Sequence, residues 1–147
     1  MISCTKFLAL MKGELQKNRI SVELELDEHL PVTKADRIQV QQVLTNLMTN
    51  AVEAMAEKKW PRILRIKSAI QEPGGVLISV ADTGKGIDPN IADRIFNPLF
   101  TTKPDGMGLG LAICRSIIEA HDGRLWASPG VQGGSVFQFV LPANVAP

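Results

Sequence analysis

Tyrosine is absent from the 147 residues, and histidine, cysteine and tryptophan each occur only twice. The two cysteines, Cys4 and Cys114, lie far apart, which excludes the dense disulfide framework of a small secreted domain. Because Cys114 falls within an apolar helical pattern, we expect a buried thiol in a reducing compartment. No apolar run approaches the ~20 residues of a membrane span, and no signal-peptide core follows Met1. We therefore expect a cytoplasmic domain with no direct membrane insertion.

An excess of charge of either sign is also missing. The chain has 16 lysine and arginine residues against 15 aspartate and glutamate residues, for a net charge of +1. This balance gives no broad basic surface for nucleic acid and no acidic bias toward disorder. The hydrophobic fraction of 45% is enough for a sizeable core. No repeat or linker divides the chain, so we expect residues 1–147 to form one domain.

Two kinds of periodicity are present. Apolar residues recur every three or four positions over 37–55, which predicts a long helix with Asp36 as its N-cap. A second helix is predicted over 111–120, ending at Asp122-Gly123, and a helical pattern also occurs near the start, over 7–16. Apolar and polar residues alternate in stretches that predict strands over 20–26, 63–70, 76–82, 124–128 and 135–142. Residues 84–110, rich in glycine and proline, are predicted to form a long loop of the kind that is usually functional or disordered.

Two asparagines lie on the long predicted helix. Asn46 and Asn50 are four residues apart and share one face, although asparagine is a mediocre helix former. Amide oxygens are hard ligands that suit Mg²⁺ together with phosphates and water. The alternative is a solvated polar face beside the apolar stripe.

The stretch VADTGKGID comes directly after a predicted strand. Asp82 stands where strand ends commonly present functional groups, and its carboxylate can accept a hydrogen bond from the amino group of adenine. Gly84 and Gly86 would let the backbone turn tightly and approach a ligand. The alternative is a simple turn, because aspartate and glycine favour turns for local reasons.

The stretch GMGLGL, Gly106–Leu111, opens the second predicted helix. The N–H groups and the positive dipole end of a helix start favour an anion, and glycine allows close approach. Lys103, beside these glycines, is a candidate phosphate cation, with a solvated side chain as the alternative. Phe96, Leu99 and Phe100 are expected to pin this loop onto the core.

Together, four motifs resemble the nucleotide-binding boxes of sensor histidine kinases. They are N-x-x-x-N-A at 46–51, D-x-G-x-G at 82–86, F-x-P-x-F-T-T-K at 96–103 and G-x-G-x-G-L at 106–111, in this order. The resemblance covers about residues 20–142, with H-D-G at 121–123 and the closing G-G-S-x-F-x-F-x-L-P in keeping, and is greatest for the nitrogen-regulation and oxygen-sensing branch. It implies an α+β fold, a two-layer α/β sandwich with helices packed on one face of a mixed β-sheet, and a mobile ATP lid at about 88–110.

By position, the resemblance implies ATP and Mg²⁺ as cofactors. Asn50 would be the Mg²⁺ ligand and Asn46 its helper near the phosphates, while Asp82 would bind the adenine amino group. Gly84, Gly86 and Ile87 would form the adenine pocket. The lid and phosphate contacts would come from Thr102, Lys103, Gly106, Met107, Gly108, Leu109, Gly110 and Leu111. No acid or base residue in this chain is implied.

Two departures from the family pattern matter. Glu53 stands where many members carry a basic residue, so phosphate charge would be met mainly by Mg²⁺ and the lid, Lys103 above all. Leu99 replaces the more usual aromatic residue, which keeps a hydrophobic anchor but could loosen the lid.

The activity implied is transfer of the γ-phosphoryl group of Mg-ATP to a histidine on a separate dimerisation hairpin, and from there to a response-regulator receiver domain. No such hairpin is found here, so the chain is expected to be a catalytic fragment whose first residues, 1–19, include the tail of the connection. The full-length protein could be tethered to a membrane. Two alternatives remain open, a hydrolase of the same superfamily and a nucleotide-binding module without transfer activity.

Overall fold

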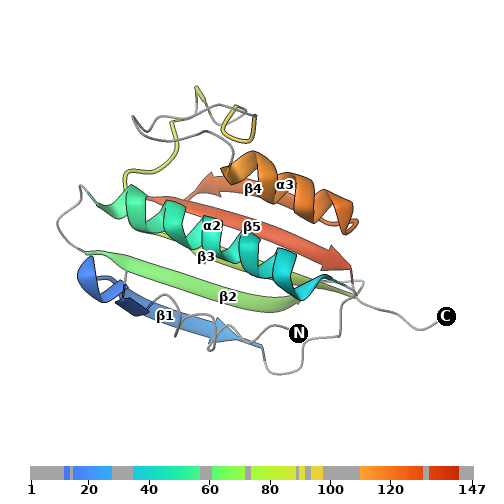
Figure 1. Ribbon diagram of the computed structural model, residues 1–147. Helices are drawn as coiled ribbons and strands as arrows, with labels where there is room; N and C mark the ends of the chain where they lie inside the picture. Colours follow the sequence, from blue (N-terminus) through green and yellow to red (C-terminus); the bar gives the residue numbers. More distant parts are fainter. Residues whose placement is uncertain are drawn as a thin grey trace.

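The computed structural model describes residues 12–13, 15–27, 35–56, 61–71, 74–88, 90–91, 94–97, 110–130 and 133–142. Figure 1 shows the order of the elements along the chain. They are β1 (Ser21–Leu26), α2 (Arg37–Met55), β2 (Ile63–Gln71), β3 (Gly75–Ala81), α3 (Gly110–Ala120), β4 (Arg124–Pro129) and β5 (Ser135–Pro142). Each of these helices and strands was expected from the sequence, with boundaries that differ by at most one residue. The described parts of 84–97 contain no helix or strand, as the predicted loop requires.

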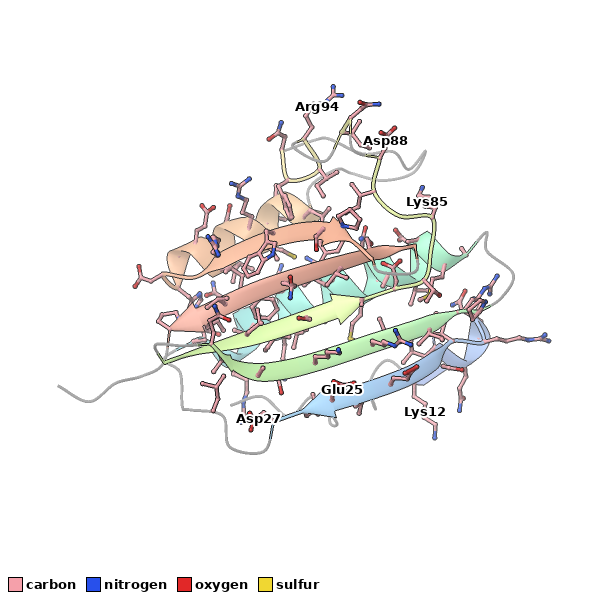
Figure 2. All side chains as sticks on the ribbon, turned by 180° about the vertical axis from the view of Figure 1, so that it is seen from behind. Lys12, Glu25, Asp27, Lys85, Asp88 and Arg94 are labelled. Carbon is pink, nitrogen blue, oxygen red and sulfur yellow. The ribbon has the colours of Figure 1, made fainter. Side chains whose placement is uncertain are left out.

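The strands form one mixed sheet in the order β1-β2-β3-β5-β4. β1 runs parallel to β2, and the other three neighbouring pairs are antiparallel. Both α2 and α3 cover the same face of this sheet, and the view from behind in Figure 2 shows the strands in front of the helices. The two-layer α+β architecture predicted from the family resemblance is therefore confirmed.

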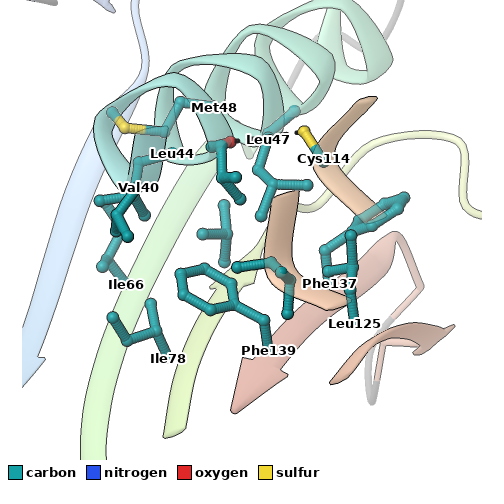
Figure 3. Packing of buried hydrophobic residues seen from close by; sticks show 14 of the residues in the cluster. Val40, Leu44, Leu47, Met48, Ile66, Ile78, Cys114, Leu125, Phe137 and Phe139 are labelled. Carbon is teal, nitrogen blue, oxygen red and sulfur yellow. Dashed lines mark hydrogen bonds between the residues drawn. The ribbon is translucent and has the colours of Figure 1, made fainter. Parts of the chain in front are cut away.

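The core lies between the helices and this face of the sheet (Figure 3). Every second residue of β5 points inward, so Phe137, Phe139 and Leu141 are buried. On α2 the residues spaced by three and four, among them Leu44 and Leu47, are buried against them. Burying a side chain of this size contributes about 1.5–3 kcal/mol, and this packing fixes the position of α2 over the sheet.

The ends of both helices have identifiable causes. Asp36 caps α2, because its Oδ1 accepts a hydrogen bond of 3.1 Å from the N–H of Gln39. α3 ends where Asp122 adopts a left-handed conformation with φ of 61°, and the N–H of Gly123 bonds back to the carbonyl of Ile118 at 2.9 Å. The predicted stop at Asp122-Gly123 is confirmed, although the aspartate rather than the glycine takes the left-handed conformation.

Strand β1 is less buried than its alternating sequence suggests. Leu24, on an apolar position of the pattern, is 41% exposed. The outward face of β1 carries Glu23 and Glu25, which pair with Arg65 and Lys67 of β2 at 3.2 and 3.5 Å. These pairs are exposed and contribute little stability.

Among the helices in the described ranges, none has the length and apolar character to cross a membrane.

Candidate functional site

Asp82 and the loop that follows it lie at the end of the sheet where β3 stops. Asp82 follows the last residue of β3, and Ser135 begins the neighbouring β5. The C-terminal end of α2 reaches the same place, since the carbonyl of Ala54 accepts a 3.3 Å hydrogen bond from the N–H of Lys85. In Figure 1 this end also holds the start of α3, on the side where the chain continues from β3 toward Lys85 and Asp88.

Asp82 is a buried carboxylate held from two sides. It is 5% exposed, its Oδ1 accepts 2.8 Å from the N–H of Gly84, and its Oδ2 accepts 2.8 Å from the hydroxyl of Ser135. The backbone N–H of Asp82 donates in turn to the carbonyl of Ser135 at 2.9 Å. The two donors fix the orientation of the carboxylate at the end of β3.

Ser135 was assigned no function from the sequence. The signal was nevertheless present, because it is a polar residue at an inward-facing position of a strand whose other inward positions are apolar. Ser135 is 3% exposed, and burying a hydroxyl without a hydrogen-bond partner is costly. A buried serine at such a position therefore indicates a nearby acceptor, which the structure identifies as Asp82.

Two glycines allow this arrangement for steric reasons. A Cβ atom on Gly84 would overlap the backbone carbonyl of Ala54 at the end of α2, and one on Gly134 would overlap the carbonyl of Asp82. Gly134 also has φ of 74°, which side-chain-bearing residues rarely adopt. Gly86 has φ of 81°, and Ile87 packs against the core. The loop after β3 is thus pressed between α2 and the start of β5.

Asn46 and Asn50 lie on α2 at the border of its buried stripe, and both are half-buried. The side chain of Asn46 hydrogen-bonds the sulfur of Cys114 on α3, and Cys114 also lies 3.8 Å from the carbonyl of Val43. Burial raises the pKa of the Cys114 thiol to about 11, against the smaller opposing effect of the Asn46 hydrogen bond. Cys114 is fully buried and unpaired, which confirms the predicted buried thiol. Figure 3 shows its side chain directed from α3 toward α2.

The donor chemistry of this region suits Mg²⁺ with a phosphate ligand. Within the described ranges, no group of three or more histidine, cysteine, aspartate or glutamate residues could hold a metal ion by itself. The amide oxygens of Asn46 and Asn50 are hard ligands one helical turn apart, and Mg²⁺ commonly takes one or two protein oxygens and completes its shell with phosphates and water. The residues present therefore fit this ion when a nucleotide is bound.

Several predicted lid residues lie outside the described part of the chain. They are the loop anchors Leu99 and Phe100 and the phosphate contacts Thr102, Lys103, Gly106, Met107, Gly108 and Leu109. Gly110 and Leu111 form the first turn of α3. Phe96 packs as predicted: it is 9% exposed, meets the ring of Phe137 edge-on at 6.1 Å, and lies under the guanidinium of Arg115 at 5.6 Å.

His121 has a structural role at the end of α3. Its Nε2 accepts a 3.0 Å hydrogen bond from the N–H of Asp36, and its Nδ1 lies 2.8 Å from the carbonyl of Ile117. Because the first partner is a donor and the second an acceptor, the neutral ring with its proton on Nδ1 satisfies both. Both ring nitrogens are thus engaged: the Nε2 bond joins the end of α3 to the N-cap of α2, and the Nδ1 bond stays within the last turn of α3. The other histidine, His29, lies outside the described residues.

Comparisons with known proteins identify the family and the fold of this chain. Residues 35–145 match the family described as histidine kinase-, DNA gyrase B- and HSP90-like ATPases. The chain is 42% identical over 135 residues to the sensor protein FixL of Bradyrhizobium diazoefficiens and 43% identical over 137 residues to the sensor protein TdiS of Thauera aromatica. Each match covers 92% of this chain but only 26% and 25% of the relative. The chain thus spans about a quarter of the length of these curated relatives.

Solved structures give the same result. The catalytic domain of the histidine kinase ThkA has a TM-score of 0.82 and 38% identity, covering 94% of this chain and 88% of that domain. Full-length ShkA in complex with AMPPNP has a TM-score of 0.83 and 30% identity, covering 97% of this chain and 30% of ShkA. Given the buried aspartate, the asparagine face and these matches, the chain belongs to the family of histidine kinase-, DNA gyrase B- and HSP90-like ATPases, and within it to the catalytic domains of sensor histidine kinases.

Proposed function

We propose that this chain binds Mg-ATP at the end of the sheet where β3, α2 and α3 meet, and passes the γ-phosphoryl group to a histidine on a separate domain. The observation that carries this proposal is the buried Asp82 carboxylate, held by Gly84 and Ser135 beside the C-terminal end of α2. A carboxylate fixed in this way accepts a hydrogen bond from the amino group of adenine, which guanine lacks at that ring position.

Each residue has a defined task in this proposal. Gly84, Gly86 and Ile87 form the adenine pocket, and Asn50 holds Mg²⁺ with Asn46 as its helper near the phosphates. The lid residues, Thr102, Lys103 and Gly106 to Leu111, close over the phosphates. When bound, Mg²⁺ supplies the positive charge that offsets the phosphate oxygens. Phosphoryl transfer depends chiefly on positioning and electrostatics, so no covalent nucleophile in this chain is required.

The phosphoryl acceptor is proposed to lie outside this chain. Both ring nitrogens of His121 are engaged with backbone groups, which supports a structural rather than an accepting role. ThkA has been solved in complex with the response regulator TrrA, with a TM-score of 0.80 and 35% identity to this chain. By analogy, we propose two partners, the protein's own dimerisation and histidine-phosphoacceptor domain and a receiver domain. Residues 1–147 would be one cytoplasmic catalytic domain, with 1–19 including the tail of the connection.

The main alternative is a hydrolase of the same superfamily. Such enzymes carry a glutamate as water-activating base four residues before the metal-binding asparagine, where this chain has Asn46. An amide cannot take a proton from water at neutral pH, so hydrolysis should be slow. Binding of ATP by calorimetry, followed by a steady-state ATPase assay on the same sample, tests this. We expect tight Mg²⁺-dependent binding with minimal turnover. Rapid multiple turnover would favour the hydrolase, and no binding would refute the proposal.

A further inference from the structure

The hydrogen bonding between β2 and β3 changes from backbone to side chain where β3 ends. Arg65 and Ala81 are the last residues that pair across these antiparallel strands. In the same register, Ile63, two residues before Arg65, stands opposite Thr83, two residues after Ala81. Here the side chain of Thr83 replaces the backbone, since its Oγ1 accepts a 3.0 Å hydrogen bond from the N–H of Ile63 and donates at 2.8 Å to the carbonyl of Pro61. One hydroxyl therefore satisfies two backbone groups at the start of β2.

On the other side of β3 the pairing with β5 continues one residue further, because the N–H of Asp82 donates to the carbonyl of Ser135. Beyond Thr83, the N–H of Lys85 donates to the carbonyl of Ala54 at the end of α2. Thr83 Oγ1 also lies 3.5 Å from the sulfur of Met55, the last residue of α2. Thr83 thus joins the start of β2 and the end of α2 to the loop that carries Asp82.

We propose that Thr83 is a positioning residue for the nucleotide pocket, acting on ATP through Asp82 and Gly84 without touching the nucleotide. This inference rests on the proposed function. Thr83 separates Asp82 from Gly84, whose N–H holds the Asp82 carboxylate at 2.8 Å. Because the hydroxyl of Thr83 anchors this turn to β2, its loss releases the residue between the carboxylate and its donor. The Asp82 carboxylate then keeps the Ser135 hydroxyl as a fixed donor but loses the fixed position of the Gly84 N–H.

Variants with and without the hydroxyl separate positioning from simple stability. Thr83→Val keeps the shape but removes the hydroxyl, and Thr83→Ser keeps the hydroxyl but removes the methyl group. The matched control is Thr45→Val on α2, where the same change removes a 2.8 Å hydrogen bond to Gln41. ATP affinity is measured with and without Mg²⁺, well below the unfolding temperature. Amide hydrogen exchange at Gly84 is measured without nucleotide.

We expect Thr83→Val to weaken ATP binding about tenfold, the change expected if one hydrogen bond between the Asp82 carboxylate and the nucleotide is lost. The ratio of affinities with and without Mg²⁺ should stay unchanged, because the asparagine face is intact. Gly84 exchange should rise, Thr83→Ser should restore both readouts, and Thr45→Val should alter neither. If Thr83→Val does not fold, Thr83→Ala makes the same test.

Wild-type affinity in Thr83→Val, an equal loss in Thr45→Val, or no rescue by Thr83→Ser would overturn the inference. Failure of the proposed function would give a different result, because the wild-type protein would then not bind ATP at all. The exchange of Gly84 would still report whether Thr83 holds the loop, and unchanged exchange in Thr83→Val would refute that step.

Discussion

Replacing Asp82 by asparagine tests the adenine contact with almost no change in shape. In the native protein Oδ1 accepts from the N–H of Gly84, and Oδ2 accepts from the hydroxyl of Ser135. The amide oxygen of asparagine can keep the first bond. Its NH₂ group then faces Ser135, whose hydroxyl can rotate to accept instead of donate. An NH₂ group can only donate, so in the proposed contact it would face the adenine amino group with a donor in place of an acceptor.

The size of this effect follows from these contacts. A hydrogen bond to a charged group contributes about 1.5–3 kcal/mol, so its loss should weaken ATP binding by about 10- to 150-fold. Both internal bonds survive in weaker form, so the free energy of unfolding should fall by only about 1 kcal/mol, or about 2–4 °C in Tm.

Titration calorimetry with ATP and GTP, together with thermal unfolding, measures both quantities. Asp36→Asn is the matched control, because Asp36 Oδ1 also accepts from a backbone N–H, that of Gln39 at 3.1 Å, at the N-cap of α2. ATP affinity in Asp82→Asn equal to that of the wild type, or an equal loss in Asp36→Asn, would refute the reasoning.

Two further predictions concern the helices. Asn50→Ala should remove most of the Mg²⁺-dependent part of the nucleotide affinity, while α2 survives because alanine is the better helix former. Titrations with and without Mg²⁺ measure this, with Thr49→Ala, an exposed neighbour on the same helix, as the control. An unchanged response to Mg²⁺ in Asn50→Ala would exclude Asn50 as the ligand. Burial raises the pKa of Cys114 from 9.0 to about 11, so the unfolded chain releases this proton first. Stability should therefore be intact below pH 9 and decline by up to about 2–3 kcal/mol as the pH rises toward 11. Denaturant unfolding across this range should show a shallower decline in Cys114→Ala, and identical slopes would contradict the buried-thiol interpretation.

Local patterns were enough to predict the elements of the fold. The boundaries of α2 follow from its apolar spacing and from the Asp36 cap, both of which depend on residues close in sequence. The covering of one sheet face by both helices came from the family resemblance, because the strand order depends on pairings between distant segments. Leu24 shows the limit of alternation, since a strand with one described neighbour leaves an apolar position exposed.

The candidate site was predictable to a similar degree. Asp82, Asn46 and Asn50 could be named from their motifs, and the structure brings the first of them to the end of α2. The partners of these residues could not be named, because Ser135 is 53 positions from Asp82 and Cys114 is on a different helix from Asn46. The roles of Asp82, Asn46 and Asn50 stay predictions. The same holds for Thr102, Lys103, the glycines at 106 and 108 and the ordering of the lid by nucleotide.

The central proposal is that this chain binds ATP and that the γ-phosphoryl group passes to a histidine on a separate domain. The most direct measurement is to incubate the chain with Mg²⁺ and ATP labelled at the γ-phosphate, alone and with a separately produced dimerisation hairpin domain, and to assay acid-labile, base-stable phosphate. We expect no label on the chain alone, because both nitrogens of His121 are engaged, and label on the hairpin when it is present. Stoichiometric label at His29 or His121, or an unlabelled hairpin with ATP bound to the chain, would contradict the account.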